Sequence, residues 1–185
     1  QAGVRYSLEA AMEYIKRNIV GHLNMLEICR NYEIKNIVYA SSSSVYGGNT
    51  KVPFSINDRV DTPVSLYAAT KRSDELMSYT YNHLYGINTI GLRFFTVYGP
   101  WGRPDMATWI FTKKIINDEP IEVFNNGNME RDFTYIDDII NGTISILDSC
   151  KDDSNESFSK VYNIGNNKPE NLLNFITLIE ENLGK

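Results

Sequence analysis

The sequence is poor in the residues that build metal sites and disulfide frameworks. Its 185 residues include two cysteines and two histidines. Cys29 and Cys150 lack the spacing of metal ligands, and neither His22 nor His83 has a cysteine or an acidic cluster around it. We therefore expect two ordinary thiols within helices and no metal site.

Net charge and hydropathy argue against two further classes of protein. The formal charge of −5 is spread along the chain, with no basic face for nucleic acid and no polybasic segment for a membrane surface. The apolar runs are far shorter than the roughly 18 residues that a membrane-spanning helix needs, and the first residues lack the layout of a signal peptide. We expect a cytoplasmic protein that can bury one core and whose partners are small molecules.

One glycine motif is also missing. A dinucleotide-binding fold normally begins with a strand and a Gly-x-Gly-x-x-Gly turn, which brings the pyrophosphate to a helix N-terminus. The nearest glycine pairs here, Gly47-Gly48 and Gly99 with Gly102, do not lie between an early strand and a helix. If the chain has such a fold, we expect its first nucleotide-binding half to be absent.

What the sequence does contain is a cluster of hydroxyls followed by a Tyr-x-x-x-Lys pattern. Residues 36–40 are apolar and β-branched, which predicts a buried parallel strand that leads into Ser41–Ser44. Helix-start residues at 61–65 then place Tyr67 and Lys71 four apart on one face of a helix. The ammonium favours the phenolate by its opposite charge, which makes the phenol a usable base, and a serine hydroxyl can share or relay the proton.

The remaining pattern predicts alternating helices and strands. An apolar stripe predicts a helix over residues 7–30, with Ser7 as its N-cap, that packs into the core, and the Tyr67 helix is expected to end at Gly86. Further strands are predicted at 87–95, 120–124, 131–136 and 161–165, further helices at 105–118, 137–147 and 169–183, and polar loops at 49–61 and 151–160. The apolar stripe consists of Leu8, Met12, Ile15, Ile19, Leu23 and Leu26.

These motifs carry a resemblance to a known superfamily. Ser42, Tyr67 and Lys71 match the Ser, Tyr-x-x-x-Lys constellation of the short-chain dehydrogenases/reductases. Three longer segments resemble the extended nucleotide-sugar epimerases, and most of all the UDP-glucuronate 4-epimerases: Ala40–Gly47, Arg93–Asp105 and Arg131–Asp138. The resemblance covers nearly the whole chain, in the right order.

The resemblance implies an α/β fold, a partial Rossmann-like doubly wound parallel sheet with part of a small α/β substrate-binding subdomain. Residues 1–100 would form the second half of the NAD-binding domain, without the Gly-rich N-terminal half. Residues 101–185 would form the UDP-sugar-binding portion, with interleaved returning Rossmann elements, and the family's further C-terminal residues would also be missing. The helices 7–30 and 65–85 would pair in a homodimer.

The same resemblance implies roles for particular residues. Ser42, Tyr67 and Lys71 would be catalytic. The residues expected to contact NAD are Ala40, Ser41, Tyr67, Lys71, Phe94 and Val97. The residues expected to contact the UDP-sugar are Ser42, Ser43, Ser44, Thr96, Arg103, Phe124, which would stack on uracil, and Arg131, which would hold the diphosphate.

The implied reaction interconverts UDP-glucuronate and UDP-galacturonate by C4 epimerisation through a transient 4-keto sugar. Its implied role is to supply nucleotide sugars for surface polysaccharide synthesis. Arg103, with Ser43 and Ser44, would hold the uronate carboxylate. Related dehydratases place an acid near these serines, so their neutrality favours simple epimerisation. A neutral or N-acetylated UDP-hexose epimerase or dehydratase, an inert epimerase-like chain that binds UDP-sugar, and a first half supplied by another polypeptide remain alternatives.

Several residues also have a purely structural interpretation. Phe124 could be a buried strand aromatic, Arg131 could pair with Glu130 or Asp132 on the surface, and Asp137 with Asp138 fits a helix start better than an acid/base dyad. An uncovered sheet edge would make the chain oligomeric or marginally stable.

Overall fold

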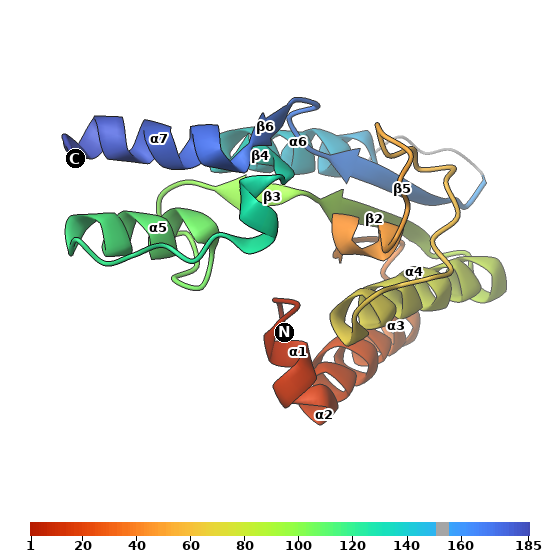
Figure 1. Ribbon diagram of the computed structural model, residues 1–185. Coiled ribbons are helices and arrows are strands. Elements are labelled where there is room, and N and C mark those ends of the chain that lie inside the picture. Colours follow the sequence, from red (N-terminus) through yellow and green to blue (C-terminus); the bar gives the residue numbers. More distant parts are fainter. Residues whose placement is uncertain (151–155) are drawn as a thin grey trace. The chain divides into compact units, whose positions relative to one another are not determined.

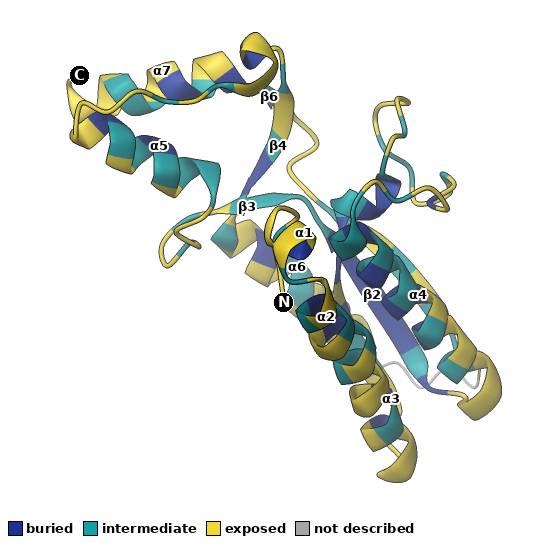
Figure 2. Cartoon of the chain, turned by 60° about the horizontal axis from the view of Figure 1, so that its bottom comes forward, coloured by how far each residue is buried: buried dark blue, intermediate teal, exposed yellow. Residues whose placement is uncertain are grey.

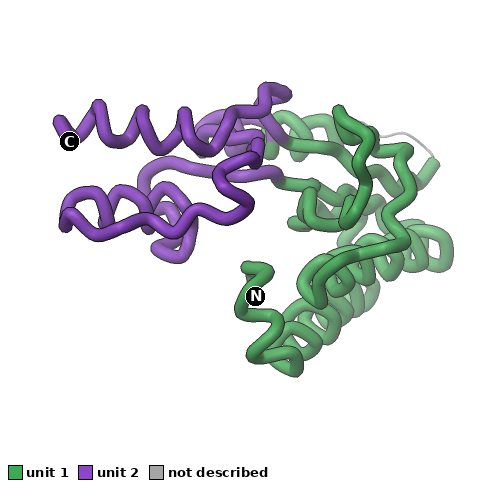
Figure 3. Tube along the Cα trace, viewed as in Figure 1, with its two compact units in different colours: residues 1–94, 143–164 green, residues 95–142, 165–185 purple. Residues whose placement is uncertain are grey.

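The computed structural model describes residues 1–150 and 156–185. The chain divides into two compact units: residues 1–94 with 143–164, and residues 95–142 with 165–185 (Figure 3). Part of the loop predicted at 151–160 lies outside the described residues. Its last two residues, Ser159 and Lys160, belong to a strand instead.

Unit 1 is built on a three-stranded parallel sheet. The strands β1 (Asn36–Ser42), β2 (Asn88–Phe94) and β5 (Ser159–Ile164) lie in the order β1-β2-β5. Figure 1 shows β2 beside β5. Gly91 of β2 lies opposite Tyr39, and a Cβ there would come 2.7 Å from the Tyr39 hydroxyl oxygen. Glycine therefore makes room for the buried Tyr39 ring. The strands predicted at 36–40, 87–95 and 161–165 are confirmed.

The helix α4 (Leu66–Tyr85) packs against β1 and β2, and α3 (Gly21–Asn31) packs against α4 (Figure 1). Both ends of α4 follow the sequence signals. At its start, the Ser65 Oγ accepts a hydrogen bond from the Ala68 N–H at 3.1 Å. At its end, Gly86 adopts the left-handed conformation, with φ 67°. The predicted helix carrying Tyr67 and Lys71 is confirmed.

The single helix predicted over residues 7–30 is wrong. The segment is divided into α1 (Tyr6–Glu9), α2 (Ala11–Tyr14), a π-helical turn over Ile15–Val20, and α3. Ala10 interrupts the helix, with φ −126° and ψ 51°. Ser7 lies inside α1 rather than at its N-cap, and its hydroxyl donates to the Val4 carbonyl at 2.5 Å.

The buried face of these N-terminal helices is also not the predicted apolar stripe. Leu8, Met12 and Leu23 are exposed, whereas Tyr14 and Asn18 are buried. Figure 2 shows that much of the surface of α1, α2 and α3 is exposed. The Asn18 amide donates to the Thr70 hydroxyl of α4 at 3.0 Å. The apolar stripe does not predict the buried face, because the face turned towards α4 is partly polar. The residues buried along the segment are Ser7, Tyr14, Asn18, Leu26 and Cys29.

Unit 2 contains the strands β3 (Thr96–Tyr98), β4 (Glu130–Tyr135) and β6 (Pro169–Asn171), in the order β3-β4-β6, with β3 parallel and β6 antiparallel to β4. The helices α5 (Ala107–Ile116) and α7 (Leu172–Leu183) bury their apolar faces together. This core consists of Phe111, Ile115, Leu172 and Ile176.

α6 (Ile136–Ser149) follows β4, and it confirms the helix predicted there. Asp137 and Asp138 lie in its first turn, where carboxylates favourably face the helix dipole. Their interpretation as helix-starting residues is therefore confirmed. The predicted helix at 105–118 and the strand at 131–136 are confirmed as α5 and β4.

Two predicted elements of unit 2 are wrong. The strand expected at 120–124 is absent; a 3-10 turn, Phe124–Gly127, includes Asn125 and Asn126 at positive φ. The last helix does not begin at Pro169, because Pro169–Asn171 pairs with β4 as β6. The Asn171 side chain accepts from the Leu173 N–H at 2.9 Å and caps α7 instead.

Candidate functional site

The four consecutive serines lie on a tight turn at the carboxyl end of β1. Ser42 ends the strand in an extended conformation, and its Oγ accepts from the Ser44 N–H at 3.2 Å, which starts the 3-10 turn Ser43–Tyr46. Gly47 follows with φ 57°, and a Cβ there would be 2.2 Å from the Thr62 carbonyl oxygen. Glycine is thus required where this turn meets the segment before α4. The turn places polar groups at the edge where open α/β sheets bind ligands.

Lys71 reaches this edge from α4. Its Nζ donates to the Ala40 carbonyl oxygen of β1 at 3.0 Å. Tyr67 lies one turn earlier on the same helix face and is half-buried, with its ring edge-to-face against Tyr14 at 6.1 Å between centroids. The structure therefore brings Lys71 to the strand end and places Tyr67 on the same side of the helix.

Sequence reasoning missed a carboxylate beside the lysine. Asp74 Oδ2 lies 3.1 Å from Lys71 Nζ. Asp74 is 1% exposed, and within the described part of the chain its Oδ1 has no hydrogen-bond partner. Burial raises the pKa of Asp74 to about 6, although the Lys71 ammonium opposes this. The spacing i, i+3 between a lysine and an acid on one helix was the signal that could have revealed the pair.

A second buried carboxylate, Glu75, was also missed. Its Oε1 accepts from the Ser41 hydroxyl at 2.7 Å and from Arg93 Nε at 2.8 Å. Its Oε2 accepts from Arg93 Nη2 and from Arg72 Nη1, both at 2.9 Å. Burial acts to raise the pKa of Glu75, but the bonds from Arg93 and Ser41 outweigh it, and the pKa is lowered. Ser41, predicted to contact NAD, directs its hydroxyl to this carboxylate.

Arg93 extends the same cluster to Tyr46. Arg93 Nη1 donates to the Tyr46 hydroxyl at 3.0 Å, and that hydroxyl donates to Asn163 Oδ1 at 2.7 Å. The guanidinium also lies over the Tyr46 ring, 4.9 Å from its centroid. β1, α4, β2 and β5 are thereby joined by one buried set of polar groups.

The other predicted residues lie at the end of β2 and in unit 2. Phe94, Thr96 and Val97 are half-buried near the point where β2 passes into β3. Arg103 lies on the exposed loop before α5, and its Nε donates to Asp105 Oδ1 at 3.0 Å. The hydrogen bond from Arg103 lowers the pKa of the Asp105 carboxyl.

Phe124 and Arg131 both lie on the surface of unit 2. Phe124 is 57% exposed in its 3-10 turn, so its interpretation as a buried strand aromatic is wrong. Arg131 is exposed on β4, and its Nη1 donates to the main-chain carbonyl of Glu130 at 2.8 Å. Neighbouring Asp132 has a structural role, because its carboxylate accepts from the N–H groups of Asn166 and Asn167, each at 2.8 Å.

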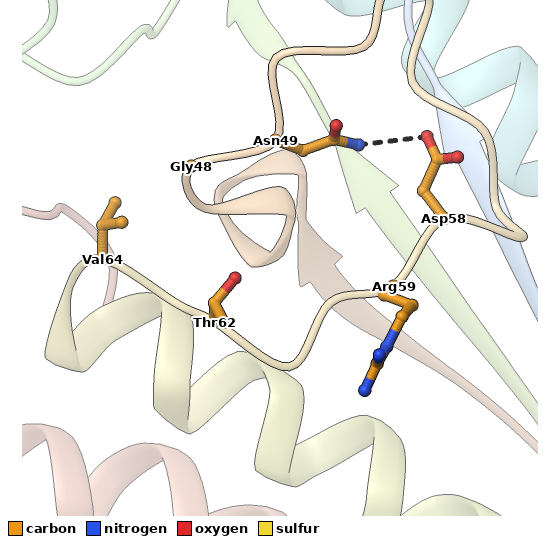
Figure 4. Close-up of a pocket in the computed structure, with 6 residues that line it drawn as sticks. All are labelled: Gly48, Asn49, Asp58, Arg59, Thr62 and Val64. Carbon is orange, nitrogen blue, oxygen red and sulfur yellow. Dashed lines mark hydrogen bonds between the residues drawn. The ribbon is translucent and has the colours of Figure 1, made fainter.

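The hollow on the surface of unit 1 does not coincide with the predicted site. A hollow of about 350 Å³ in unit 1 is lined by the loop between the serine turn and α4, and it contains none of the predicted site residues (Figure 4). Asp58 of this lining accepts from the Asn49 amide at 3.2 Å. The lining residues are Gly48, Asn49, Asp58, Arg59, Thr62 and Val64.

Among the described residues, none of the helices combines the length and the apolar character that a membrane span requires.

Sequence comparisons identify relatives of the chain. The chain is 55% identical over its whole length to the protein CapI of Staphylococcus aureus and covers 59% of that protein. It is 49% identical to UDP-glucuronate 4-epimerase 3 of Arabidopsis thaliana, with 97% of this chain and 44% of that protein aligned. The chain therefore spans about half the length of the curated relatives it matches.

Solved structures give the same result. The UDP-glucuronic acid 4-epimerase from Bacillus cereus, solved with UDP-glucuronic acid and NAD, superposes with a TM-score of 0.89 at 36% identity. All of this chain and 57% of that chain are covered. The UDP-N-acetylglucosamine 4-epimerase from Methanobrevibacter ruminantium gives 0.87 at 29% identity, covering 100% of this chain and 58% of that one. These likenesses confirm the predicted Rossmann-like fold class.

The family assignment rests on the length of the match as well. Residues 1–165 match the NAD dependent epimerase/dehydratase family, whose cofactor is NAD, as the sequence predicts. This stretch includes the serine turn of β1, Tyr67 and Lys71 of α4, and the strands β2 to β5. The chain is thus a member of the NAD dependent epimerase/dehydratase family, related to nucleotide-sugar epimerases.

Proposed function

We propose that the protein catalyses NAD-dependent epimerisation at C4 of a UDP-hexuronic acid, interconverting UDP-glucuronate and UDP-galacturonate. One observation carries the proposal: the Lys71 ammonium is held on the Ala40 carbonyl at the carboxyl end of β1, beside the serine turn and on the helix face of Tyr67. This arrangement suits removal of a proton from a sugar hydroxyl. The named relatives supply the substrate class.

The described residues fit the nicotinamide side of NAD. The Lys71 ammonium, held at the carboxyl end of β1, offers N–H donors to the ribose hydroxyls, and Ala40, Ser41, Phe94 and Val97 are the other proposed contacts. The sequence contains no Gly-rich turn for the pyrophosphate. Bound NAD would accept the C4 hydride and return it to the opposite face of the sugar.

Tyr67 is the proposed base, and it takes the proton from the 4-hydroxyl. Lys71 stabilises the phenolate by its charge, and Ser42 donates a hydrogen bond to the reacting oxygen. Ser42 Oγ already accepts from the Ser44 N–H, so its own proton is directed elsewhere. When the sugar is reduced again, Tyr67 returns the proton, and the sequence of steps leaves no net oxidation.

Arg103, Ser43 and Ser44 are the proposed ligands of the uronate carboxylate. The 4-keto form of a uronate is a β-keto acid, and holding its carboxylate in a fixed orientation opposes loss of carbon dioxide. Arg103 is paired with Asp105 on the exposed surface, where ion pairs contribute little, so its guanidinium can exchange onto a substrate anion. Neutral serines beside the reacting centre favour epimerisation over elimination.

Residues on unit 2 are proposed to bind the rest of the nucleotide sugar. The exposed ring of Phe124 offers a face on which uracil can stack. The exposed guanidinium of Arg131 matches a diphosphate in charge and geometry. Thr96 is proposed to contact the sugar.

Assembly and cellular role are proposals as well. α3 and α4 both expose apolar side chains: Leu23 and Ile28 on α3, and Leu76 and Tyr79 on α4. These side chains support a homodimer in which the two helices of one protomer pack against those of its partner. A cytoplasmic enzyme that supplies surface polysaccharide synthesis is the role we infer from the nucleotide-sugar substrate.

One alternative is supported by a specific observation. The likeness to a UDP-N-acetylglucosamine 4-epimerase favours an N-acetylated or neutral hexose as an alternative substrate.

The test is incubation of the 185-residue chain with NAD⁺ and UDP-glucuronate, with UDP-galacturonate followed by chromatography and a heat-denatured control. A second preparation grafts residues 1–185 in place of the matching segment of the S. aureus relative, to supply the regions that it has in addition. Turnover in either preparation, lost in Tyr67→Phe, supports the proposal. If neither turns over UDP-glucuronate while the graft turns over UDP-N-acetylglucosamine or UDP-glucose, the uronate assignment is wrong; no turnover of any of them contradicts the activity.

A further inference from the structure

Glu75 extends the helix face that carries the proposed catalytic pair. Tyr67, Lys71 and Glu75 follow one another at four-residue spacing along α4, so they lie on one side of it. Glu75 is the innermost of the three, and its side chain is 2% exposed. Arg93, its main partner, is 3% exposed and comes from β2. The pair is therefore an ion pair inside unit 1, below the carboxyl edge of the sheet.

This ion pair anchors the serine turn at both of its ends. Before the turn, the Ser41 hydroxyl donates to Glu75 at 2.7 Å. At the last residue of the turn, the Tyr46 hydroxyl accepts from Arg93 Nη1 at 3.0 Å. The hydroxyls of residues 42–44 lie between these two anchors, and the sheet and α4 supply the anchor groups.

The strand alternation makes the first anchor informative. Successive side chains of a strand point to opposite faces, so fixing Ser41 towards α4 fixes the direction in which Ser42 leaves the chain. The second anchor is reinforced by Asn163 of β5, which accepts from the same Tyr46 hydroxyl. Both anchors thus determine where the turn lies relative to α4, the helix of Tyr67 and Lys71.

Stabilisation of the fold does not by itself explain why Glu75 and Arg93 form a buried ion pair. Burying two charges costs solvation free energy, and apolar residues of similar volume often replace a buried pair without loss of stability. A buried network that satisfies its members does, however, hold them in one arrangement. Here the held parts are the serine turn and the helix of the proposed base.

We propose that Glu75 and Arg93 are positioning residues, which hold the Ser42–Ser44 hydroxyls in register with Tyr67 and Lys71. The proposal rests on the proposed function for its chemistry, but the anchoring can be tested without turnover. Misplacement of a reacting group by about 1 Å can reduce a rate by about 100-fold, so a loosened turn should reduce kcat more than substrate binding.

The test uses the double variant Glu75→Leu/Arg93→Met, which replaces the ion pair by an apolar pair. Arg93→Met alone leaves a buried carboxylate without its main partner, and we expect it to lower the melting temperature. The double variant should recover most of that loss. Arg72→Gln is the control, because it removes one donor from Glu75 and leaves both anchors in place.

The first measurement is amide hydrogen exchange on the 185-residue chain. The amides of Ser44 and Gly47 are bonded within the turn, to Ser42 Oγ and to the Ser44 carbonyl. In the double variant both should exchange at least about ten times faster, while the amide of Leu92 in β2 keeps its rate. Unchanged exchange at Ser44 and Gly47 would overturn the proposal, whether or not the chain has activity.

The second measurement is turnover, in whichever preparation is active. The double variant should lose about 100-fold in kcat with KM changed less than about threefold, and Arg72→Gln should leave kcat unaffected. A double variant that regains wild-type kcat together with its stability would show that the pair is structural and nothing more. If the wild type is inactive in both preparations, the proposed function fails, and the exchange rates decide the anchoring by themselves.

Discussion

The polar groups near the proposed reaction centre of unit 1 are buried and bonded to side chains from several elements, whereas the two arginines proposed to bind substrate in unit 2, Arg103 and Arg131, are exposed and bonded to their sequence neighbours. Glu75 and Arg93 join α4 to β2 across 18 positions of sequence, and both are almost inaccessible to solvent. Arg103 pairs with Asp105, two positions away, on the surface.

This difference matches the work proposed for each unit. A group that moves a proton must be held in place before the substrate arrives, because catalysis depends on a preorganised geometry. A group that captures a phosphate or carboxylate can exchange a weak surface partner for the ligand. We therefore expect variants of unit 1 to change kcat, and variants of unit 2 to change KM and specificity.

The largest effect is expected for Tyr67→Phe, which removes the proposed base and keeps the ring that packs against Tyr14. Loss of general base catalysis reduces rates by about 10²- to 10⁴-fold, so kcat should fall by that factor with little change in KM. The control is Tyr79→Phe, an exposed tyrosine on the same helix. Equal activity of Tyr67→Phe and the wild type would remove Tyr67 from the mechanism.

The second prediction concerns pH and the two buried acids of α4. The pKa of Asp74 rises from 3.8 to about 6, mainly through burial, so the folded chain binds more protons than the unfolded chain between these values. The contribution of Asp74 to stability should therefore fall as pH rises through this window, by about 3 kcal/mol, since each pKa unit corresponds to about 1.4 kcal/mol.

Urea unfolding of the wild type and of Asp74→Asn at pH 4, 5, 6 and 7 measures this term. The free energy of unfolding of the wild type should fall relative to that of the variant across the series. The neighbouring acid, Glu75, has a lowered pKa. Its contribution to stability therefore has the opposite sign and is lost as pH falls below the usual pKa of a glutamate. Lys71, His22 and Glu75 also face this region, and Asn at position 74 leaves all three in place. A constant difference between wild type and variant would mean that Asp74 titrates normally.

Much of unit 1 could be predicted from sequence because its signals are local. Ser65 and Gly86 mark both ends of α4, and the β-branched run marks β1. Tyr67 and Lys71 follow from their spacing. The partners of Lys71 and Ser41 could not be predicted so well, because Asp74 and Glu75 resemble ordinary exposed helix acids until the strands are placed beside them.

The errors have physical causes as well. The N-terminal helix was predicted from its apolar residues, but the face that meets α4 contains Asn18 and His22, and these polar contacts override the apolar period. Phe124 follows apolar residues typical of a strand, yet Asn125 and Asn126 adopt left-handed conformations and form a turn. Asparagine tolerates this conformation better than most residues, which was the available signal.

The third prediction tests the specificity expected of unit 2. Arg103→Ala should reduce kcat/KM for UDP-glucuronate by about 10- to 100-fold, because hydrogen bonds to charged groups contribute about 1.5–3 kcal/mol. UDP-glucose has no carboxylate and is the matched control substrate, with little change expected in any turnover of it. Equal losses on both substrates would exclude a carboxylate role and would suggest that Arg103 orders the loop before α5.

The smallest effect is expected for the surface ion pair itself, compared with the buried one. Asp105→Ala removes the partner of Arg103 where both side chains are well exposed, at 43% and 61%, so the free energy of unfolding should change by less than about 1 kcal/mol. Arg93→Met breaks the buried pair, and such losses are typically about 3–5 kcal/mol. Urea unfolding at low and high salt measures both, and salt should diminish only the surface term. If the two variants lost equal stability, the two units would not differ in how strongly their ion pairs are held. A smaller loss in Asp105→Ala would support exchange of Arg103 from Asp105 onto a substrate anion.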